Sequence, residues 1–190
     1  MHMALYHPRD DSHLLAIALP QYVKGKRVLD MGAGSGFLAE AVLKAGADSV
    51  TACESDAESI AYLKRKRYKK IRIIRSNLFS KVHSMFDVIL CNSPYLPRDA
   101  REPRESAKAT TGGTRGDEFI LRFLKQALQH LTKDGVILLL LSSLTPRKRI
   151  IALLKKLKMK YEVVAQQKLF FETLEVWKIE PVSIASDSNN

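Results

Sequence analysis

Cysteine and long apolar runs are scarce in this chain of 190 residues. Its two cysteines, Cys53 and Cys91, each lie at the end of an apolar run, which is typical of small buried residues and disfavours a disulfide framework or a metal site. No apolar run approaches the roughly 20 residues of a membrane-spanning helix. The first residues also lack the basic start and apolar middle of a secretory signal. We therefore expect a cytoplasmic protein that does not bind membranes.

Acidic residues are the minority among the charged residues: the chain has 31 Lys and Arg but only 20 Asp and Glu, which gives a net charge of +11. Two basic runs, 64–70 and 147–160, carry much of the excess. A positive field favours polyanions such as RNA or the ribosome, or acidic protein partners. Solvated helix faces explain the same runs equally well. The charge alone leaves both interpretations open.

The apolar pattern predicts alternating strands and helices in one domain over 1–183, with a disordered tail over 184–190. Proline at position 20 is expected to interrupt the first helix, and a polar loop should run to about Gly116. The last two strands have no helix between them and should form an antiparallel hairpin. The fold class is therefore α/β, with a single doubly wound, mostly parallel seven-stranded sheet. Helices are predicted at 11–19, 37–44, 56–68, 117–131 and 146–158, and strands at 26–30, 49–54, 71–75, 86–91, 135–141, 161–168 and 174–180.

A glycine-rich turn, Asp-Met-Gly-Ala-Gly-Ser-Gly over 30–36, closes the first predicted strand and opens a helix. Ligands bind at this position in doubly wound sheets, and glycines let the backbone approach them closely. A nicotinamide-binding fingerprint would need its third glycine at position 37, which is Phe37. The phosphate loop of ATPases would need Lys and Ser or Thr directly after Gly36. Both of these nucleotide-binding classes are therefore disfavoured.

The spacing Asp-x-Gly-x-Gly-x-Gly resembles motif I of the class I S-adenosylmethionine methyltransferases, which have a Rossmann-like fold. Glu54 ends the second strand, about 20 residues on, where a carboxylate can accept two hydrogen bonds from ribose hydroxyls. After the third strand, Asn77 and Leu78 stand where the family has Asp-Leu, and the amide oxygen can still accept from the adenine amino group. The resemblance also assigns to the cofactor S-adenosylmethionine the loop residues Asp30, Gly32, Ala33, Gly34 and Gly36.

The tetrapeptide Asn92-Ser93-Pro94-Tyr95 follows the fourth strand and resembles the Asn-Pro-Pro-Tyr motif of amino-methyltransferases. A nitrogen with a delocalised lone pair must be held in place for methyl transfer. Acceptor groups must bind its hydrogens, and the face of the planar group must point toward the methyl donor. The Asn92 side-chain oxygen and the Ser93 carbonyl can be those acceptors, and Tyr95 can stack on the planar group. Asn92 is also expected to touch the cofactor. Ser93 departs from the family motif, although Pro94 still favours an extended Ser93. An ordinary strand-terminating turn is the alternative interpretation.

Three further stretches narrow the resemblance to the HemK-like protein glutamine methyltransferases, especially the short archaeal and eukaryotic branch that modifies class I release factors. The segment 6–12 is similar to the branch's leading Tyr-x-Pro-x-Glu-Asp-Thr, so that Tyr6, Asp11 and Ser12 inherit cofactor contacts. The segment 111–116 resembles the Gly-Gly-x-x-Gly loop of the family, and 172–176 resembles its C-terminal hairpin.

This resemblance implies methylation of the glutamine amide in the Gly-Gly-Gln loop of a release factor. It also implies a small zinc-ribbon activator that pairs along the sheet edge, which the family order places at the third strand, 71–75. The same site type accepts exocyclic amines of adenine or guanine in RNA, and lysine methylation occurs within the family. A non-catalytic binding subunit with this fold is the remaining alternative, because Ser93 and Asn77 depart from the motifs.

Overall fold

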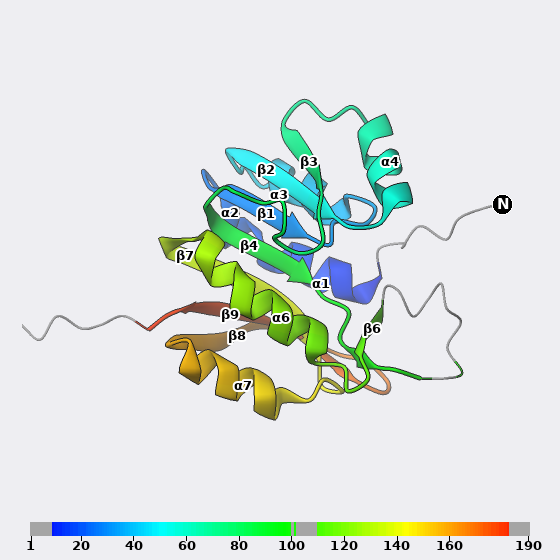
Figure 1. Cartoon of the computed structure of the whole chain (residues 1–190), viewed down its shortest axis with the longest axis vertical. Helices are drawn as coiled ribbons and strands as arrows, with labels where there is room; N and C mark the ends of the chain where they lie inside the picture. Colours follow the sequence, from blue (N-terminus) through cyan, green and yellow to red (C-terminus); the bar gives the residue numbers. More distant parts are fainter. Residues whose placement is uncertain (1–8, 100, 102–109, 183–190) are drawn as a thin grey trace, which may run out of the picture.

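A computed structural model describes residues 9–99, 101 and 110–182 (Figure 1). It confirms the predicted α/β fold, with a seven-stranded sheet in the order β3-β2-β1-β4-β7-β9-β8. Neighbouring strands are parallel from β3 to β7, while β9 runs antiparallel to both β7 and β8. The strands are β1 (Arg27–Met31), β2 (Ser49–Glu54), β3 (Ile71–Arg75), β4 (Phe86–Asn92), β7 (Leu131–Ser142), β8 (Met159–Lys168) and β9 (Thr173–Pro181), with a separate short pair of β5 (Leu96–Pro97) and β6 (Thr111–Gly113). The expected tail at 184–190 lies outside the described residues.

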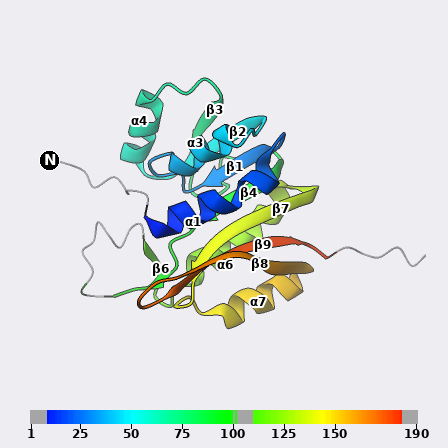
Figure 2. The ribbon, with the colours of Figure 1, turned by 180° about the vertical axis from the view of Figure 1, so that it is seen from behind.

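Helices cover both faces of this sheet, as a parallel sheet requires. The helices α6 and α7 lie on the face seen in Figure 1, and α1 and α3 lie on the face seen in Figure 2. Buried side chains of β4 alternate between the two layers: Val88 and Leu90 pack toward α1 and α3, whereas Ile89 and Cys91 pack toward α6 and α7. The helices are α1 (Asp10–Ala18), α2 (Pro20–Val23), α3 (Phe37–Lys44), α4 (Ala57–Arg65), α6 (Glu118–Ala127), the 3-10 turn η1 (Leu128–His130) and α7 (Arg147–Lys156).

The structure corrects several predicted boundaries. A second short helix, α2, begins at Pro20, because proline is well tolerated at the first position of a helix. The helix predicted to reach 131 ends at Ala127, and β7 already begins at Leu131. The polar loop before Gly116 contains β5 and β6, which are too short to give a periodic signal. None of the helices in the described part of the chain is long and apolar enough to cross a membrane.

Both cysteines are free and buried, as predicted, and they lie on the α6 and α7 side of the sheet. Burial raises the pKa of the Cys53 thiol to about 12, and the carboxylate of Glu54 adds to this effect. Burial likewise raises the pKa of Cys91 well above its ordinary value. Neither thiol is therefore ionised at neutral pH.

Candidate active site

The carboxyl ends of the parallel strands meet at one edge of the sheet, and the glycine loop after β1 lies there. Gly32 and Gly36 have φ angles of +81°, in the left-handed region that favours glycine. A side chain at Gly36 would lie 2.7 Å from Leu63 and 2.9 Å from the Tyr68 hydroxyl, so this glycine lets α4 pack on the loop. A Cβ atom at Gly32 would meet no atom within 4 Å. The loop therefore presents an open backbone surface at Gly32.

Glu54, at the end of β2, holds the same loop from the side. One carboxylate oxygen accepts a hydrogen bond from the Gly34 amide at 3.0 Å. The other oxygen accepts from the amides of Ser55 at 2.6 Å and Asp56 at 3.0 Å. The carboxylate therefore organises the ends of both β1 and β2, and its predicted contact with a ribose stays a prediction.

Asp30, at the end of β1, is fully buried. Neither of its carboxylate oxygens has a hydrogen-bond partner among the described residues. Burial raises the pKa of Asp30 to about 7, and the nearby charge of Glu54 adds to this, whereas the backbone amide of Ala39 on α3 partly offsets it without meeting hydrogen-bond geometry. A buried carboxylate without a partner is energetically costly, so this position suits a ligand that brings a cationic or hydrogen-donating group. The ammonium group of S-adenosylmethionine has this character, so the loop and Asp30 fit that cofactor.

Asn92 ends β4, and its side chain is connected to α1. Its Nδ2 donates a hydrogen bond at 3.1 Å to the hydroxyl of Ser12, which is buried. Asp11 accepts from the Ser12 backbone amide at 2.6 Å. The structure thus brings together Asn92 and Ser12, which lie 80 positions apart in the sequence. With its amino group engaged, Asn92 has its Oδ1 left to accept a hydrogen bond, since no donor to it is found in the described part of the chain.

The residues after Asn92 are held by the sheet and by the 111–116 loop. The buried Ser93 hydroxyl donates to the Leu140 carbonyl of β7 at 3.1 Å. A Cβ atom at Gly112 would lie 2.6 Å from the Pro94 carbonyl oxygen, and one at Gly116 would lie 3.0 Å from the Tyr95 carbonyl oxygen. These two glycines therefore let the loop lie directly against the tetrapeptide. The half-buried Tyr95 side chain packs against both core clusters.

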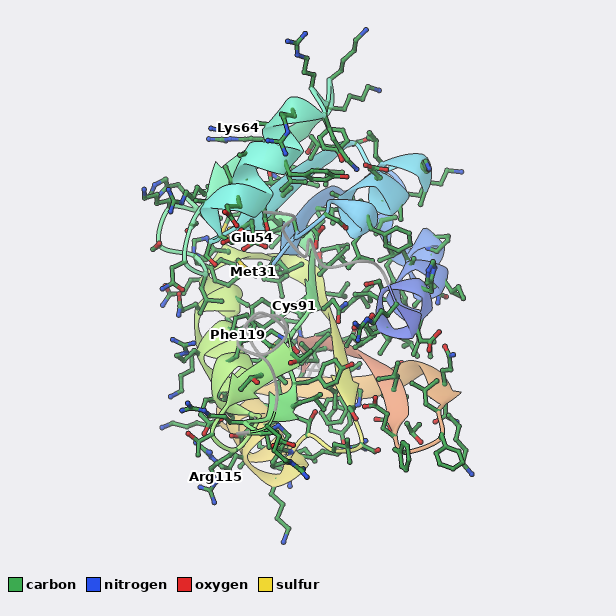
Figure 3. All side chains as sticks on the ribbon, turned by 90° about the vertical axis from the view of Figure 1, so that its right-hand side faces the viewer. Met31, Glu54, Lys64, Cys91, Arg115 and Phe119 are labelled. Atoms are coloured by element: carbon green, nitrogen blue, oxygen red, sulfur yellow. The ribbon has the colours of Figure 1, made fainter. Side chains whose placement is uncertain are left out.

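The other predicted site residues are less closely tied to this edge. Asn77 is exposed, and Leu78 is buried with a φ of +48°. The Cys53 thiol donates to the Leu78 carbonyl at 3.5 Å, which connects this turn to the end of β2. Tyr6 lies outside the described residues. Figure 3 looks onto the carboxyl edge, where the labelled Glu54, Met31 and Cys91 follow one another from top to bottom near the centre.

The residues that support these loops carry no motif in the sequence. The Tyr68 hydroxyl and the Lys66 ammonium both donate to Glu40 on α3, and Lys66 also donates to the Ser35 carbonyl at 3.4 Å. The Thr145 hydroxyl donates to the Tyr95 carbonyl at 3.2 Å. No periodic or motif signal marks these contacts, because they join segments that are distant in the sequence. Within the described residues, no group of three or more His, Cys, Asp or Glu side chains could hold a metal ion.

Comparison with known proteins identifies the family of this chain. Residues 9–172 match the methyltransferase small domain family. The chain belongs to this family. A candidate protein N5-glutamine methyltransferase of Methanocaldococcus jannaschii is 36% identical over 187 residues, which cover 94% of each chain. The release factor glutamine methyltransferase of Gloeobacter violaceus is 32% identical over 150 residues, or 70% of this chain and 52% of the bacterial protein. This methyltransferase thus spans about half the length of that bacterial relative.

Among solved structures, the chain is similar to a chain of the E. cuniculi Mtq2-Trm112 complex, which is described as responsible for methylation of the eRF1 translation termination factor. The TM-score is 0.76 with 23% sequence identity, and the match covers 95% of this chain and 100% of the other. At that level of identity, the similarity supports the fold of this family member.

Proposed function

We propose that this methyltransferase uses S-adenosylmethionine to methylate the side-chain amide of the glutamine in the Gly-Gly-Gln loop of a translation release factor. The observation that carries the proposal is the orientation of Asn92, whose Nδ2 is engaged by Ser12. Its Oδ1 can therefore accept an N–H of a planar target amide. The similarity to two proteins named as glutamine methyltransferases supports an amide as the target.

One set of residues in this chain would bind the cofactor, and another set would bind the target. Asp30, the glycine loop and Glu54 would hold the cofactor, and Asn77, Leu78, Asp11 and Ser12 complete that set. When bound, S-adenosylmethionine supplies an electrophilic methyl group on its sulfonium. Asn92 Oδ1 and the Ser93 carbonyl would accept the two amide hydrogens, while Tyr95 stacks on the amide plane. We also propose that 1–183 form one methyltransferase domain.

The direct test is a methylation assay with purified chain, labelled S-adenosylmethionine and a class I release factor, followed by fragment mass spectrometry. We expect one added methyl group on the glutamine amide. A release factor with Asn in place of that glutamine is the matched control and should stay unlabelled. Absence of transfer to the glutamine, together with position-specific transfer to RNA or to lysine, would overturn the proposal.

A second candidate function is an RNA amino-methyltransferase, which a localised charge asymmetry favours. The segment 59–86 contains nine basic residues and no acidic residue, whereas the remainder of the chain has 22 basic and 20 acidic residues. The nine residues lie on α4, on β3 and in the turns that flank β3, and all are exposed, although the Lys66 ammonium is paired with Glu40. They are Lys64, Arg65, Lys66, Arg67, Lys69, Lys70, Arg72, Arg75 and Lys81. Uniform positive charge of this kind suits a phosphate backbone, and labelling of RNA in the assay above distinguishes the two functions.

We further propose that a small zinc-ribbon activator pairs with the edge of the sheet at β3. In the described part of the chain, β3 pairs only with β2, so its outer backbone groups are available to a partner strand. The exposed Arg72 and Arg75 can protect the same edge by charge instead. Co-expression with a zinc-ribbon protein from the same organism, followed by size-exclusion chromatography and the methylation assay, tests the pairing. A chain that elutes alone with unchanged activity would contradict it.

A further inference from the structure

Two adjacent phenylalanines at the tip of the β8–β9 hairpin are the most exposed large apolar side chains in the described part of the chain. Phe170 is 92% exposed and Phe171 is 84% exposed. Their rings contact each other edge to face, with centroids 4.5 Å apart. Burying one such side chain contributes about 1.5–3 kcal/mol. Neither ring contributes appreciable burial to the fold, so their exposure indicates a surface that is covered by something else.

Hydrogen bonds hold the residues on either side of the two phenylalanines in place. The Leu169 amide donates to the Glu172 carbonyl at 2.7 Å, which closes the turn. The Ser142 hydroxyl at the end of β7 donates to the Glu172 carboxylate. Backbone and side-chain hydrogen bonds also join Ser143 to Thr173. The two phenylalanines are thus presented on a fixed turn, which reduces the entropy lost when a partner covers them.

These hydrogen-bonded residues are connected to the candidate active site. The Thr145 hydroxyl donates to the Tyr95 carbonyl, and it also accepts from the Ser142 amide at 3.3 Å. Hydrogen bonds therefore lead from the tetrapeptide to the hairpin through Thr145, Ser142 and Glu172. In both Figures 1 and 2, the hairpin tip lies beside β6, on the side of the molecule toward which β4 points. Leu144, which is half exposed, adds apolar surface next to Ser142.

We propose that Phe170, Phe171 and Leu144 form a docking surface for the protein that carries the target amide. This inference rests on the proposed function. A target on a protruding loop needs contacts between the enzyme and the body of its substrate, and this surface lies on the same edge as Asn92. An activator at β3 would not cover it, because five strand spacings separate β3 from β9, or about 24 Å.

The test compares Phe170→Ser/Phe171→Ser with the unchanged chain on two substrates, an intact release factor and a short peptide containing Gly-Gly-Gln. For the intact factor we expect KM to rise at least about 10-fold, because two apolar anchors are lost, while kcat changes less than about 2-fold. The peptide kinetics and the cofactor affinity should not change. Ile17→Ser is the matched control, because Ile17 is 75% exposed on α1 but belongs to no contact described above, and it should leave both substrates unaffected.

An unchanged KM for the intact factor in the double variant would overturn the docking surface and leave the proposed function intact. Equal loss on the peptide and the intact factor would also overturn it, because the tip would then act on the structure of the site. A dimer of the unchanged chain that the double variant abolishes, with unaltered KM, would assign the tip to contacts between copies. Failure of the unchanged chain to methylate either glutamine substrate would overturn the proposed function itself, and the docking surface with it.

Discussion

The carboxyl ends of β1 and β4 lie side by side in the sheet, with Asp30 opposite Leu90. The two strand ends differ in the hydrogen bonding of their polar side chains. At β1, the buried Asp30 carboxyl has no hydrogen-bond partner within the described residues. At β4, Asn92 and Ser93 both donate to other segments of the chain. The proposed target side of the site is thus organised by hydrogen bonds within the chain, whereas on the proposed cofactor side Asp30 keeps an electrostatic cost of burial.

The sharpest test of the target side is Asn92→Ala. We expect kcat to fall at least about 100-fold, because the variant loses a preorganised acceptor for the target nitrogen. Cofactor affinity, measured by calorimetry, should stay within about 2-fold, because this side chain acts mainly on the target. Asn77→Ala, an amide on the cofactor side, is the matched contrast and should affect cofactor affinity rather than kcat. Near-normal turnover in Asn92→Ala would remove the distinction between the two sides.

On the cofactor side, Glu54→Ala should weaken cofactor binding by about 1.5–3 kcal/mol, because charged hydrogen bonds to ribose and to the Gly34 amide are lost. Calorimetric titration measures the change. Glu58→Ala removes an acidic residue from the first turn of α4 and controls for net charge. If the two variants bind the cofactor equally well, Glu54 acts only on the fold.

Asp30 provides a test by pH. Its folded-state pKa of about 7 lies above the ordinary 3.8, so the stability it contributes is fully present below pH 3.8 and is lost as the pH rises through 7. Asp30→Asn should therefore stabilise the ligand-free chain by up to about 4 kcal/mol at pH 8, and this advantage should nearly vanish near pH 4. Denaturant unfolding at the two pH values checks this.

The same titration should affect cofactor binding in the opposite direction, so that affinity rises with pH whereas stability falls. Protonation of Asp30 removes a carboxylate that would pair with an ammonium group, so cofactor affinity should fall as the pH drops below about 7. The Asp30→Asn variant should bind more weakly and show no such step. A step of equal size in both proteins would assign it to another group.

The smallest expected effect is that of Ser93→Ala. Loss of the hydroxyl that donates to Leu140 should reduce the free energy of unfolding by about 1 kcal/mol. Turnover should change less than about 3-fold, because the Ser93 carbonyl remains in place. A decrease in kcat as large as that of Asn92→Ala would show that the side chain itself acts on the target.

The sequence predicted the element order and sheet class well, because apolar strands and charged helices alternate clearly. It also predicted that Asn92 and Ser12 share a site, but only through family resemblance, since no local pattern links residues 80 positions apart. It could not predict that the Ser93 hydroxyl bonds to Leu140, because this depends on strand register. Nor could it reveal that the buried Asp30 carboxyl lacks a hydrogen-bond partner among the described residues, because this depends on how the chain packs around the end of β1.

The two buried thiols give this methyltransferase a built-in reporter of local opening. Cys53 lies next to Glu54, and Cys91 lies next to Asn92, so each thiol marks one side of the site. Because burial keeps both thiols protonated and shielded, an alkylating reagent can reach them only when the surrounding strand ends separate. The alkylation rate of each cysteine therefore measures how often its own half of the site opens, without any label having to be introduced.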